Sequence, residues 1–192
     1  MDLSNDVSYL ELVVGPMFSG KTLFLINKFN ELNSKGKSVL VINHSLDKRY
    51  TNSNCNIVAH NGESIPITII TDKLLNIEEE ILNNYYNILI NEGQFFEDLI
   101  DFTKKNLLKN KIIYISGLDG DFKQNKFGYI LDLIPICDNI TKLKSYCKLC
   151  KNDTNKNAIF SHRIINNLDQ TFIGSHESYI PICRKCYTNQ II

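Results

Sequence analysis

The sequence predicts an α/β fold in which helices cover both faces of a parallel sheet, followed by a small cysteine-containing part. Short apolar runs that are typical of buried strands alternate with segments whose apolar residues recur at the spacing of one helical face. After about Thr141 the alternation ends, polar and basic residues dominate, and paired cysteines appear. We therefore expect a first domain over residues 1–140 and a second, smaller domain over residues 141–192.

The expected strands are nearly continuous apolar runs, because a strand covered on both faces needs no polar side. They cover residues 9–14, 39–42, 67–70, 87–91 and 112–116. Between the first two strands, Leu25, Phe29 and Leu32 recur at i, i+4 and i+7, which indicates a helix. The polar stretch 43–62 has no clear period and is predicted to be a loop. The first expected helix ends at Gly36, and two further helices are expected over residues 72–83 and 98–108.

Composition and charge argue against several classes of function. Lys+Arg and Asp+Glu both number 21, so no net charge draws the chain to nucleic-acid polymers or anionic membranes. The longest apolar runs have four residues, too few for a membrane-spanning helix. The first six residues are acidic and polar, unlike a secretory signal, so we expect a cytoplasmic protein.

Residues 15–22 fit the phosphate-binding motif G-x-x-x-x-G-K-[ST] in full, between a predicted strand and a predicted helix. Glycines let the backbone N–H groups face a phosphate, and the helix N-terminus adds partial positive charge. We expect Lys21 to neutralise phosphate oxygens and Thr22 to bind Mg²⁺. The motif predicts a P-loop NTPase-like domain and leaves the second substrate open. Its residues are Gly15, Pro16, Met17, Phe18, Ser19, Gly20, Lys21 and Thr22.

Two C-x-x-C pairs, separated by residues 151–182, predict a zinc site. Four thiolates complete a tetrahedron and leave no position for water, so the metal is expected to be structural. It would fix the two ends of the intervening segment. A redox dithiol or unrelated free thiols are the alternatives, and His162 or His176 could replace a ligand, although loop or surface positions are expected for them. The cysteines are Cys147, Cys150, Cys183 and Cys186.

Further motifs accompany the P-loop sequence GPMFSGKT, namely EGQFF at 92–96, LDG-x-F at 118–122, KFG at 126–128 and Y-x-x-x-C-R-x-C-Y at 179–187. Taken together, these motifs resemble the thymidine kinases of the cytosolic type. The resemblance covers residues 11–187 and implies ATP-dependent phosphorylation of the thymidine 5′-hydroxyl, with Mg²⁺ and structural Zn²⁺. It also implies a zinc-held "lasso" domain that covers the base, and a homotetramer.

The resemblance also assigns roles to single residues. Glu92 matches the catalytic base, which accepts the proton of the attacking hydroxyl. Asp47 and Arg49 match a D-x-R sequence whose arginine approaches the phosphates, although an isolated arginine is more often a solvated surface charge. The remaining residues matched to the nucleotide site are the P-loop, Asn91 and Gln94.

Thymine is expected to lie among aromatic and apolar side chains and under the lasso. Without the resemblance, several of these residues could equally belong to a plain core, and Asp119 and Asp121 are expected to be turn residues beside Gly120. The residues matched to thymidine binding are Phe95, Leu118, Phe122, Phe127, Gln170, Thr171, Phe172, Ile173, Gly174 and Tyr179.

Asn91 departs from the family pattern D-E-G-Q-F-F, whose aspartate contacts the metal. Its amide keeps an oxygen acceptor but carries no charge. Because Thr22 and the phosphates remain as ligands, we expect an active enzyme with weakened Mg²⁺ affinity, in which Asn91→Asp lowers the Mg²⁺ requirement. The alternatives are an inactive homologue, a kinase of another nucleoside, or a non-enzymatic zinc module that binds nucleic acid.

Overall fold

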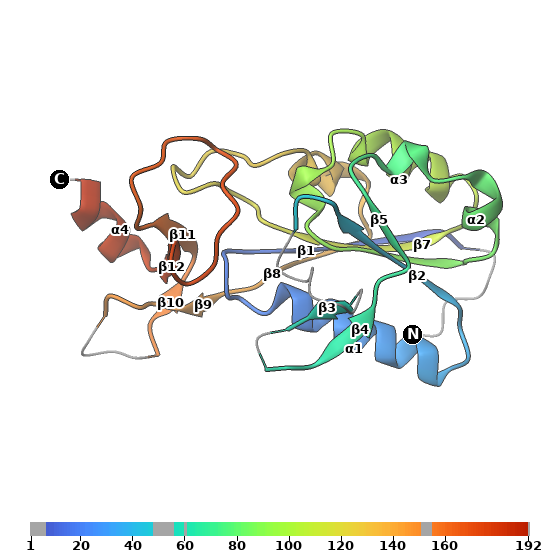
Figure 1. Ribbon diagram of the computed structural model, residues 1–192, viewed down its shortest axis with the longest axis horizontal. Helices are drawn as coiled ribbons and strands as arrows, with labels where there is room; N and C mark the ends of the chain where they lie inside the picture. Colours follow the sequence, from blue (N-terminus) through green and yellow to red (C-terminus); the bar gives the residue numbers. More distant parts are fainter. Residues whose placement is uncertain (1–6, 48–55, 60, 151–154, 192) are drawn as a thin grey trace.

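The computed structural model describes residues 7–47, 56–59, 61–150 and 155–191 (Figure 1). Six parallel strands form one sheet in the order β5–β2–β6–β7–β1–β8. The predicted α/β fold with a parallel sheet is therefore confirmed. The strands are β1 (Tyr9–Val14), β2 (Val39–His44), β5 (Ile69–Thr71), β6 (Asn87–Ile90), β7 (Ile112–Gly117) and β8 (Asn139–Lys142).

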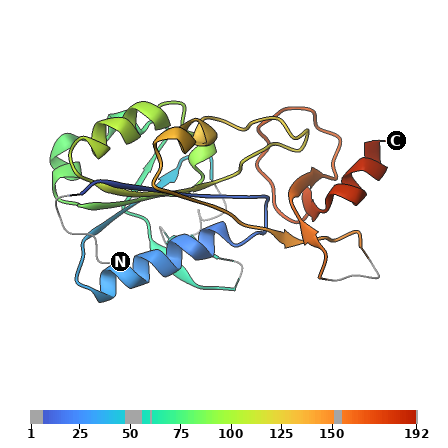
Figure 2. The same ribbon diagram turned by 180° about the vertical axis from the view of Figure 1, so that it is seen from behind.

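Helices cover both faces of this sheet, as predicted (Figures 1 and 2). On one face, Leu25 of the first helix packs in a core with Val41 and Leu89. That helix ends as expected, since Gly36 has φ 67° and its N–H donates to the carbonyl oxygen of Asn33 at 2.9 Å. The helix on this face is α1 (Lys21–Ser34), and the opposite face carries η2 (Leu74–Asn76), α2 (Glu79–Asn83), α3 (Leu99–Leu107) and η4 (Ile130–Ile136).

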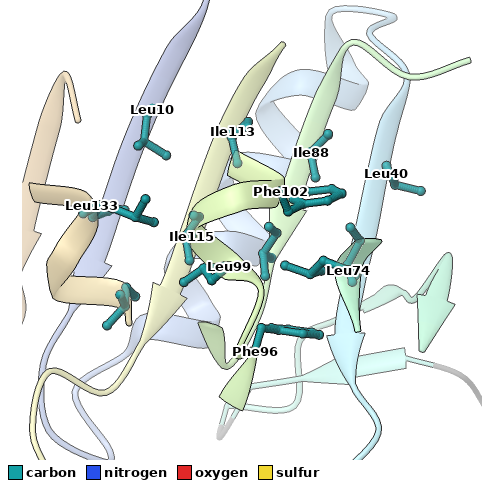
Figure 3. Packing of buried hydrophobic residues seen from close by; sticks show 14 of the residues in the cluster. Leu10, Leu40, Leu74, Ile88, Phe96, Leu99, Phe102, Ile113, Ile115 and Leu133 are labelled. Atoms are coloured by element: carbon teal, nitrogen blue, oxygen red, sulfur yellow. The ribbon is translucent and has the colours of Figure 1, made fainter. Parts of the chain in front are cut away.

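The core on the second face is built from alternate residues of neighbouring strands (Figure 3). Phe102 of α3 is fully buried in it, together with Ile88 of β6 and Ile113 of β7. Truncating such a side chain to alanine costs about 3–5 kcal/mol. This core fixes the strands whose carboxyl ends carry the candidate site.

The segment predicted as one helix over residues 72–83 forms η2 and α2 with an extended break between them. Ile77 has ψ 123° and Glu78 has ψ 137°, and neither angle allows a helix to continue. Of Leu74, Ile77 and Ile81, the apolar face expected of that helix, the first two are buried in the same core as α3. Ile81 only packs against this core, and Leu82 is buried in it instead. The prediction of a continuous helix was wrong.

The stretch 43–62 was predicted as a loop, and this is wrong at two places. β2 continues to His44, and β3 (Asn56–Val58) pairs with β4 (Ser64–Pro66) in an antiparallel hairpin. Ile57 of the hairpin is fully buried against the α1 side of the sheet. Three-residue strands are too short to show a period in the sequence, which explains the miss.

The edge strand β8 was not expected from the sequence. It pairs in parallel with β1, but most of its side chains are exposed, so it contains no apolar run. It continues past residue 140, the expected end of the first domain, and the chain leaves the sheet after Lys142. The division into two domains stays a prediction.

The part of the chain after β8 lies beyond the carboxyl end of β1 (Figures 1 and 2). Two small antiparallel pairs and a terminal helix form it. None of the helices in the described ranges has the length and apolar character needed to span a bilayer. The elements are β9 (Ser145–Tyr146) with β10 (Asn157–Ala158), β11 (Phe160–Arg163) with β12 (Tyr179–Ile182), and α4 (Arg184–Ile191).

Candidate active site

A pocket of about 240 Å³ lies where the carboxyl ends of the strands face the C-terminal part. Ligands of open parallel sheets bind at this edge. Of the described site residues, Gly15, Pro16 and Thr171 do not line the pocket, and Arg49 lies outside the described residues. The predicted site residues that line it are Met17, Phe18, Ser19, Gly20, Lys21, Thr22, Asp47, Asn91, Glu92, Gln94, Phe95, Leu118, Phe122, Phe127, Gln170, Phe172, Ile173, Gly174 and Tyr179.

The P-loop forms one wall of the pocket between β1 and α1. A Cβ atom at Gly15 would lie 2.5 Å from the carbonyl oxygen of Leu143, so only glycine fits there. Gly20, at the start of α1, has φ 91°, which glycine adopts without strain. Lys21 is buried, and its Nζ donates to the carbonyl oxygen of Pro16 at 2.7 Å. The ammonium group therefore lies across the loop, inside the curve that the motif predicts for a phosphate.

Asn91 lies directly after β6 in a chain of buried side-chain hydrogen bonds. Its Oδ1 accepts from the Ser116 hydroxyl at 3.1 Å, and its Nδ2 donates to Oδ1 of Asn43 at 3.0 Å. The amide of Asn43 in turn donates to Oδ2 of Asp47 at 3.3 Å. These hydrogen bonds thus connect the ends of β7, β6 and β2 to the Asp47 carboxylate. The sequence did not point to Asn43 or Ser116.

Glu92 carries the carboxylate expected to act as the base, and the surrounding structure holds it firmly. It is buried and has φ 53°, a left-handed conformation that is uncommon for glutamate. Gln94 donates from Nε2 to Oε2 of Glu92 at 2.7 Å and accepts the Leu118 N–H at Oε1 across 2.9 Å. A Cβ atom on Gly117 or Gly128 would lie 2.5 or 2.0 Å from atoms of Gln94, so two glycines make room for this glutamine.

Aromatic side chains line the other end of the pocket. The rings of Phe95 and Phe127 meet edge to face, with centroids 5.7 Å apart and an interplanar angle of 85°. The guanidinium carbon of Arg163 lies 3.9 Å from the centroid of the Phe122 ring. An apolar, aromatic wall of this kind suits a planar ring ligand.

The turn that contains Asp121 contacts the loop over residues 164–178. As predicted, Asp121 is a turn residue, and its Oδ1 accepts the N–H groups of Lys123 and Asn125. Its Oδ2 also accepts from Nε2 of Gln170 at 2.8 Å. This hydrogen bond joins the turn after β7 to the loop between β11 and β12.

Four cysteine sulfurs gather in the C-terminal part, each within 4.8 Å of the others. The Sγ atom of Cys150 lies 3.7 Å from that of Cys183 and 3.5 Å from that of Cys186. Four sulfurs bound tetrahedrally at about 2.3 Å from one zinc ion lie about 3.8 Å apart. The set, completed by Cys147, therefore fits a closed zinc site, and the prediction that the two pairs converge is confirmed.

The electrostatic surroundings of Cys147 also suit a metal ligand. Burial raises its pKa, but hydrogen bonds from the backbone N–H groups of Cys183 and Leu149 and from Cys150 outweigh burial and lower the pKa to about 7. The thiolate, which is the form that binds zinc, is thus accessible near neutral pH. His162 and His176 lie outside the four-cysteine group.

Three further residues contact the site without having been expected there. Ser161 of β11 accepts the N–H of Met17 at 2.9 Å, and Arg163 lies at the aromatic end of the pocket. His176 is an exposed loop residue, as expected, and it also stacks on Phe18 of the P-loop, with centroids 4.0 Å apart and planes 11° from parallel. No local sequence pattern marks these residues, because their contacts join distant segments.

Sequence comparisons with known proteins identify the family. Residues 8–187 match the family described as "Thymidine kinase". The chain belongs to the thymidine kinase family. It is 37% identical to "Thymidine kinase 1" of Dictyostelium discoideum, over 94% of this chain and 78% of that one. It is 38% identical to "Thymidine kinase" of Amsacta moorei entomopoxvirus, over 94% and 98% of the two chains. With "Thymidine kinase a" of Arabidopsis thaliana it shares 36% identity over 95% and 76% of the two chains.

Membership of the thymidine kinase family makes this chain a kinase. The resemblance inferred from the motifs is confirmed, and the comparisons give no support to a nucleic-acid-binding zinc module. The P-loop, the held carboxylate of Glu92 and the four-cysteine group are therefore parts of one phosphotransferase.

Proposed function

We propose that this chain transfers the γ-phosphoryl group of ATP to the 5′-hydroxyl of thymidine. The observation that carries the proposal is the position of Glu92 in a pocket with a P-loop at one end and aromatic side chains at the other. Such a pocket can hold a triphosphate and a flat base with a carboxylate between them.

At the phosphate end, the P-loop N–H groups and Lys21 bind the β- and γ-phosphates. Lys21 is already held within the loop by Pro16, and Thr22 follows it at the start of α1. Thr22, with groups near Asp47 and Asn91, would hold Mg²⁺ beside the phosphates, and the ion would supply charge that stabilises the oxygens of the transferred phosphoryl group. Arg49 is assigned to the phosphates by the resemblance alone.

At the nucleoside end, Phe95 and Phe127 provide an apolar wall for the thymine ring, with Leu118 and Phe122 beside them. The lasso closes over the base and recognises it through backbone groups, which reject a nucleoside whose donors and acceptors do not match. The lasso residues proposed for this role are Gln170, Thr171, Phe172, Ile173, Gly174 and Tyr179.

In the reaction, Glu92 accepts the proton of the 5′-hydroxyl as its oxygen attacks the γ-phosphorus. The new P–O bond forms on thymidine, the bond between the γ-phosphorus and the β–γ bridging oxygen breaks, and ADP leaves. Gln94 orients the Glu92 carboxylate through the hydrogen bond at 2.7 Å. Enclosure of the pocket limits transfer of the phosphoryl group to water.

The direct test is transfer of radiolabelled phosphate from ATP to thymidine by the wild type and by Glu92→Gln. We expect the variant to lose activity by about 10²–10⁴-fold, the usual contribution of a general base. Glu97→Gln is the matched control, because Glu97 is exposed and only five positions away. Equal activity of Glu92→Gln and wild type would contradict the role of Glu92.

The same assay with a panel of deoxynucleosides tests the substrate. Thymidine and deoxycytidine differ at the 4-position of the base, and we expect a clear preference for thymidine. Preferred phosphorylation of deoxycytidine would assign the chain to another nucleoside. We also propose a homotetramer with one structural zinc ion per chain. Light scattering of the purified protein tests the number of subunits, and metal analysis tests the zinc content. The proposed location is the cytoplasm.

A further inference from the structure

The loop over residues 164–178 contains no helix or strand, yet it forms much of the nucleoside end of the pocket. In Figure 1 it is the orange-red loop beside the yellow turn that follows β7. A segment of this length needs partners for its backbone carbonyl groups if it is to keep one shape. The partners lie at its two ends.

Arg163, the last residue of β11, donates to the carbonyl oxygens of Asn167 at 3.0 Å, Asp169 at 2.5 Å and Gln170 at 3.2 Å. It also donates from Nε and Nη2 to the hydroxyl of Tyr179, at 3.1 and 2.5 Å. Arg163 is buried, so these carbonyl oxygens converge on one guanidinium group away from water.

Tyr179, the first residue of β12, completes the arrangement. Its hydroxyl donates to the carbonyl oxygen of Phe172 at 2.9 Å. Arg163 and Tyr179 are also register partners in the β11–β12 pair, so the two ends of the loop meet at these residues. This one cross-strand pair thus joins the two ends of the loop and binds four carbonyl groups within it.

The same guanidinium group reaches the pocket itself. It stacks on the ring of Phe122, which lines the pocket from the turn after β7. The loop and this turn are joined further by Gln170 with Asp121 and by Nζ of Lys123 with the carbonyl oxygen of Leu168. Arg163 therefore lies between the loop and the surface on which the loop rests.

We propose that Arg163, with Tyr179, is the positioning residue that gives the 164–178 loop its nucleoside-binding shape. Arg163 acts through the loop and does not contact the reacting atoms. Tyr179 is thereby assigned to holding the loop in shape, in place of direct contact with thymidine. The proposal rests on the proposed function only for the identity of the ligand.

Arg163→Lys is the sharpest variant, because it keeps the positive charge and removes the planar fork. One ammonium group has no rigid planar fork to match the spread of acceptors, and it stacks less well on Phe122. We expect the KM for thymidine to rise about tenfold or more, with kcat reduced by less than about threefold and the KM for ATP unchanged within about twofold. Arg184→Lys is the matched control, because Arg184 also stacks on a ring, that of Phe160, but lies outside the pocket.

Hydrogen exchange of the backbone amides gives a readout that needs no substrate. In Arg163→Lys, amides of residues 164–178 should exchange faster, while those of β6, β7 and α1 keep the wild-type rate. Unchanged exchange in the loop would overturn the proposal whatever the kinetics show. A wild type that does not phosphorylate thymidine would instead refute the proposed function and leave this measurement valid.

Tyr179→Phe provides the second variant, since it keeps the ring and removes only the hydroxyl. It should shift loop exchange and the KM for thymidine in the same direction and by less than Arg163→Lys. If Arg163→Lys fails to fold, Tyr179→Phe decides the question alone. A wild-type KM together with wild-type loop exchange in Tyr179→Phe would then reject the proposal.

Discussion

The side-chain amide of Asn91 donates a hydrogen bond to Oδ1 of Asn43 across 3.0 Å, and both side chains are buried. Asn91 therefore acts as a donor as well as an acceptor, since its own oxygen accepts from Ser116. An aspartate at this position could replace the acceptor but not the donor. The amide is matched to Asn43, whose own amide donates to Asp47.

Replacing Asn91 by aspartate should therefore have two opposite effects. Negative charge beside the phosphates should lower the Mg²⁺ concentration needed for half-maximal rate. The free energy of unfolding should fall by about 1–3 kcal/mol, because Oδ1 of Asn43 would face a buried carboxylate. If Asn43 turned its amide round, its oxygen would face Asp47 instead. Magnesium titrations of the rate and urea unfolding measure the two effects.

Ser116→Ala is the control for the Asn91 experiment. It removes one hydrogen bond to Asn91 without adding charge, so it should cost about 1 kcal/mol and leave the Mg²⁺ requirement unchanged. An unchanged Mg²⁺ requirement in Asn91→Asp would show that charge at position 91 does not reach the metal. Undiminished stability of Asn91→Asp would contradict the matched pairing with Asn43.

The parts of the site that could be predicted from the sequence are those whose chemistry requires neighbouring residues. A phosphate cradle needs residues 15–22 in one turn, and a zinc knuckle needs two cysteines three positions apart. Arg163 and Asn43 could not be predicted in the same way. Their partners lie in other segments, as with the hydrogen bond from position 91 to position 43, and appear only when the sheet and loop are folded.

Prediction of the strands from the sequence has the same limit. Strands buried on both faces, such as β2, β6 and β7, were predicted because burial requires apolar side chains. The edge strand β8 was missed because three of its four side chains are polar, so no apolar run marks it. Its pairing with β1 depends on backbone hydrogen bonds, which leave little trace in side-chain chemistry.

The stack of His176 on Phe18 predicts that the C-terminal part supports the P-loop. His176→Ala should raise the Kd for an ATP analogue by about two- to tenfold, since an aromatic pair contributes about 0.5–1.5 kcal/mol. His176→Phe should restore the wild-type Kd, because it keeps a planar ring. Calorimetric titration measures both. Equal affinity of wild type and His176→Ala would mean that the stack does not affect the loop.

The four-cysteine group predicts one tightly bound zinc ion per chain. Cys183→Ser should bind less than about a tenth of an equivalent, because one thiolate of the tetrahedron is lost. The central sheet should survive, since its core contains none of these cysteines. Cys137→Ser is the matched control, because Cys137 lies outside the group. Atomic absorption and far-ultraviolet circular dichroism measure zinc and fold, and full zinc binding by Cys183→Ser would contradict the assignment.

His44 predicts a dependence of stability on pH. Burial lowers its pKa below the usual 6.5, although Asp72, Asp47 and Asp98 act in the opposite direction. The ring packs against Phe96 with centroids 4.6 Å apart, so protonation would place a charge in an apolar setting.

Between the lowered pKa and 6.5, the unfolded chain binds more protons at this position than the folded chain does. The free energy of unfolding should therefore decrease as the pH falls through about 6.5, and this decrease should end below the folded pKa. His44→Asn keeps an acceptor for the N–H of Leu46, which Nδ1 of His44 accepts at 3.0 Å, and removes the titrating group. Because burial also lowers the pKa of His162, a shallower slope will remain in His44→Asn. Urea unfolding between pH 5 and pH 8 measures the slopes, and identical slopes for the two proteins would exclude His44 as a source of the dependence.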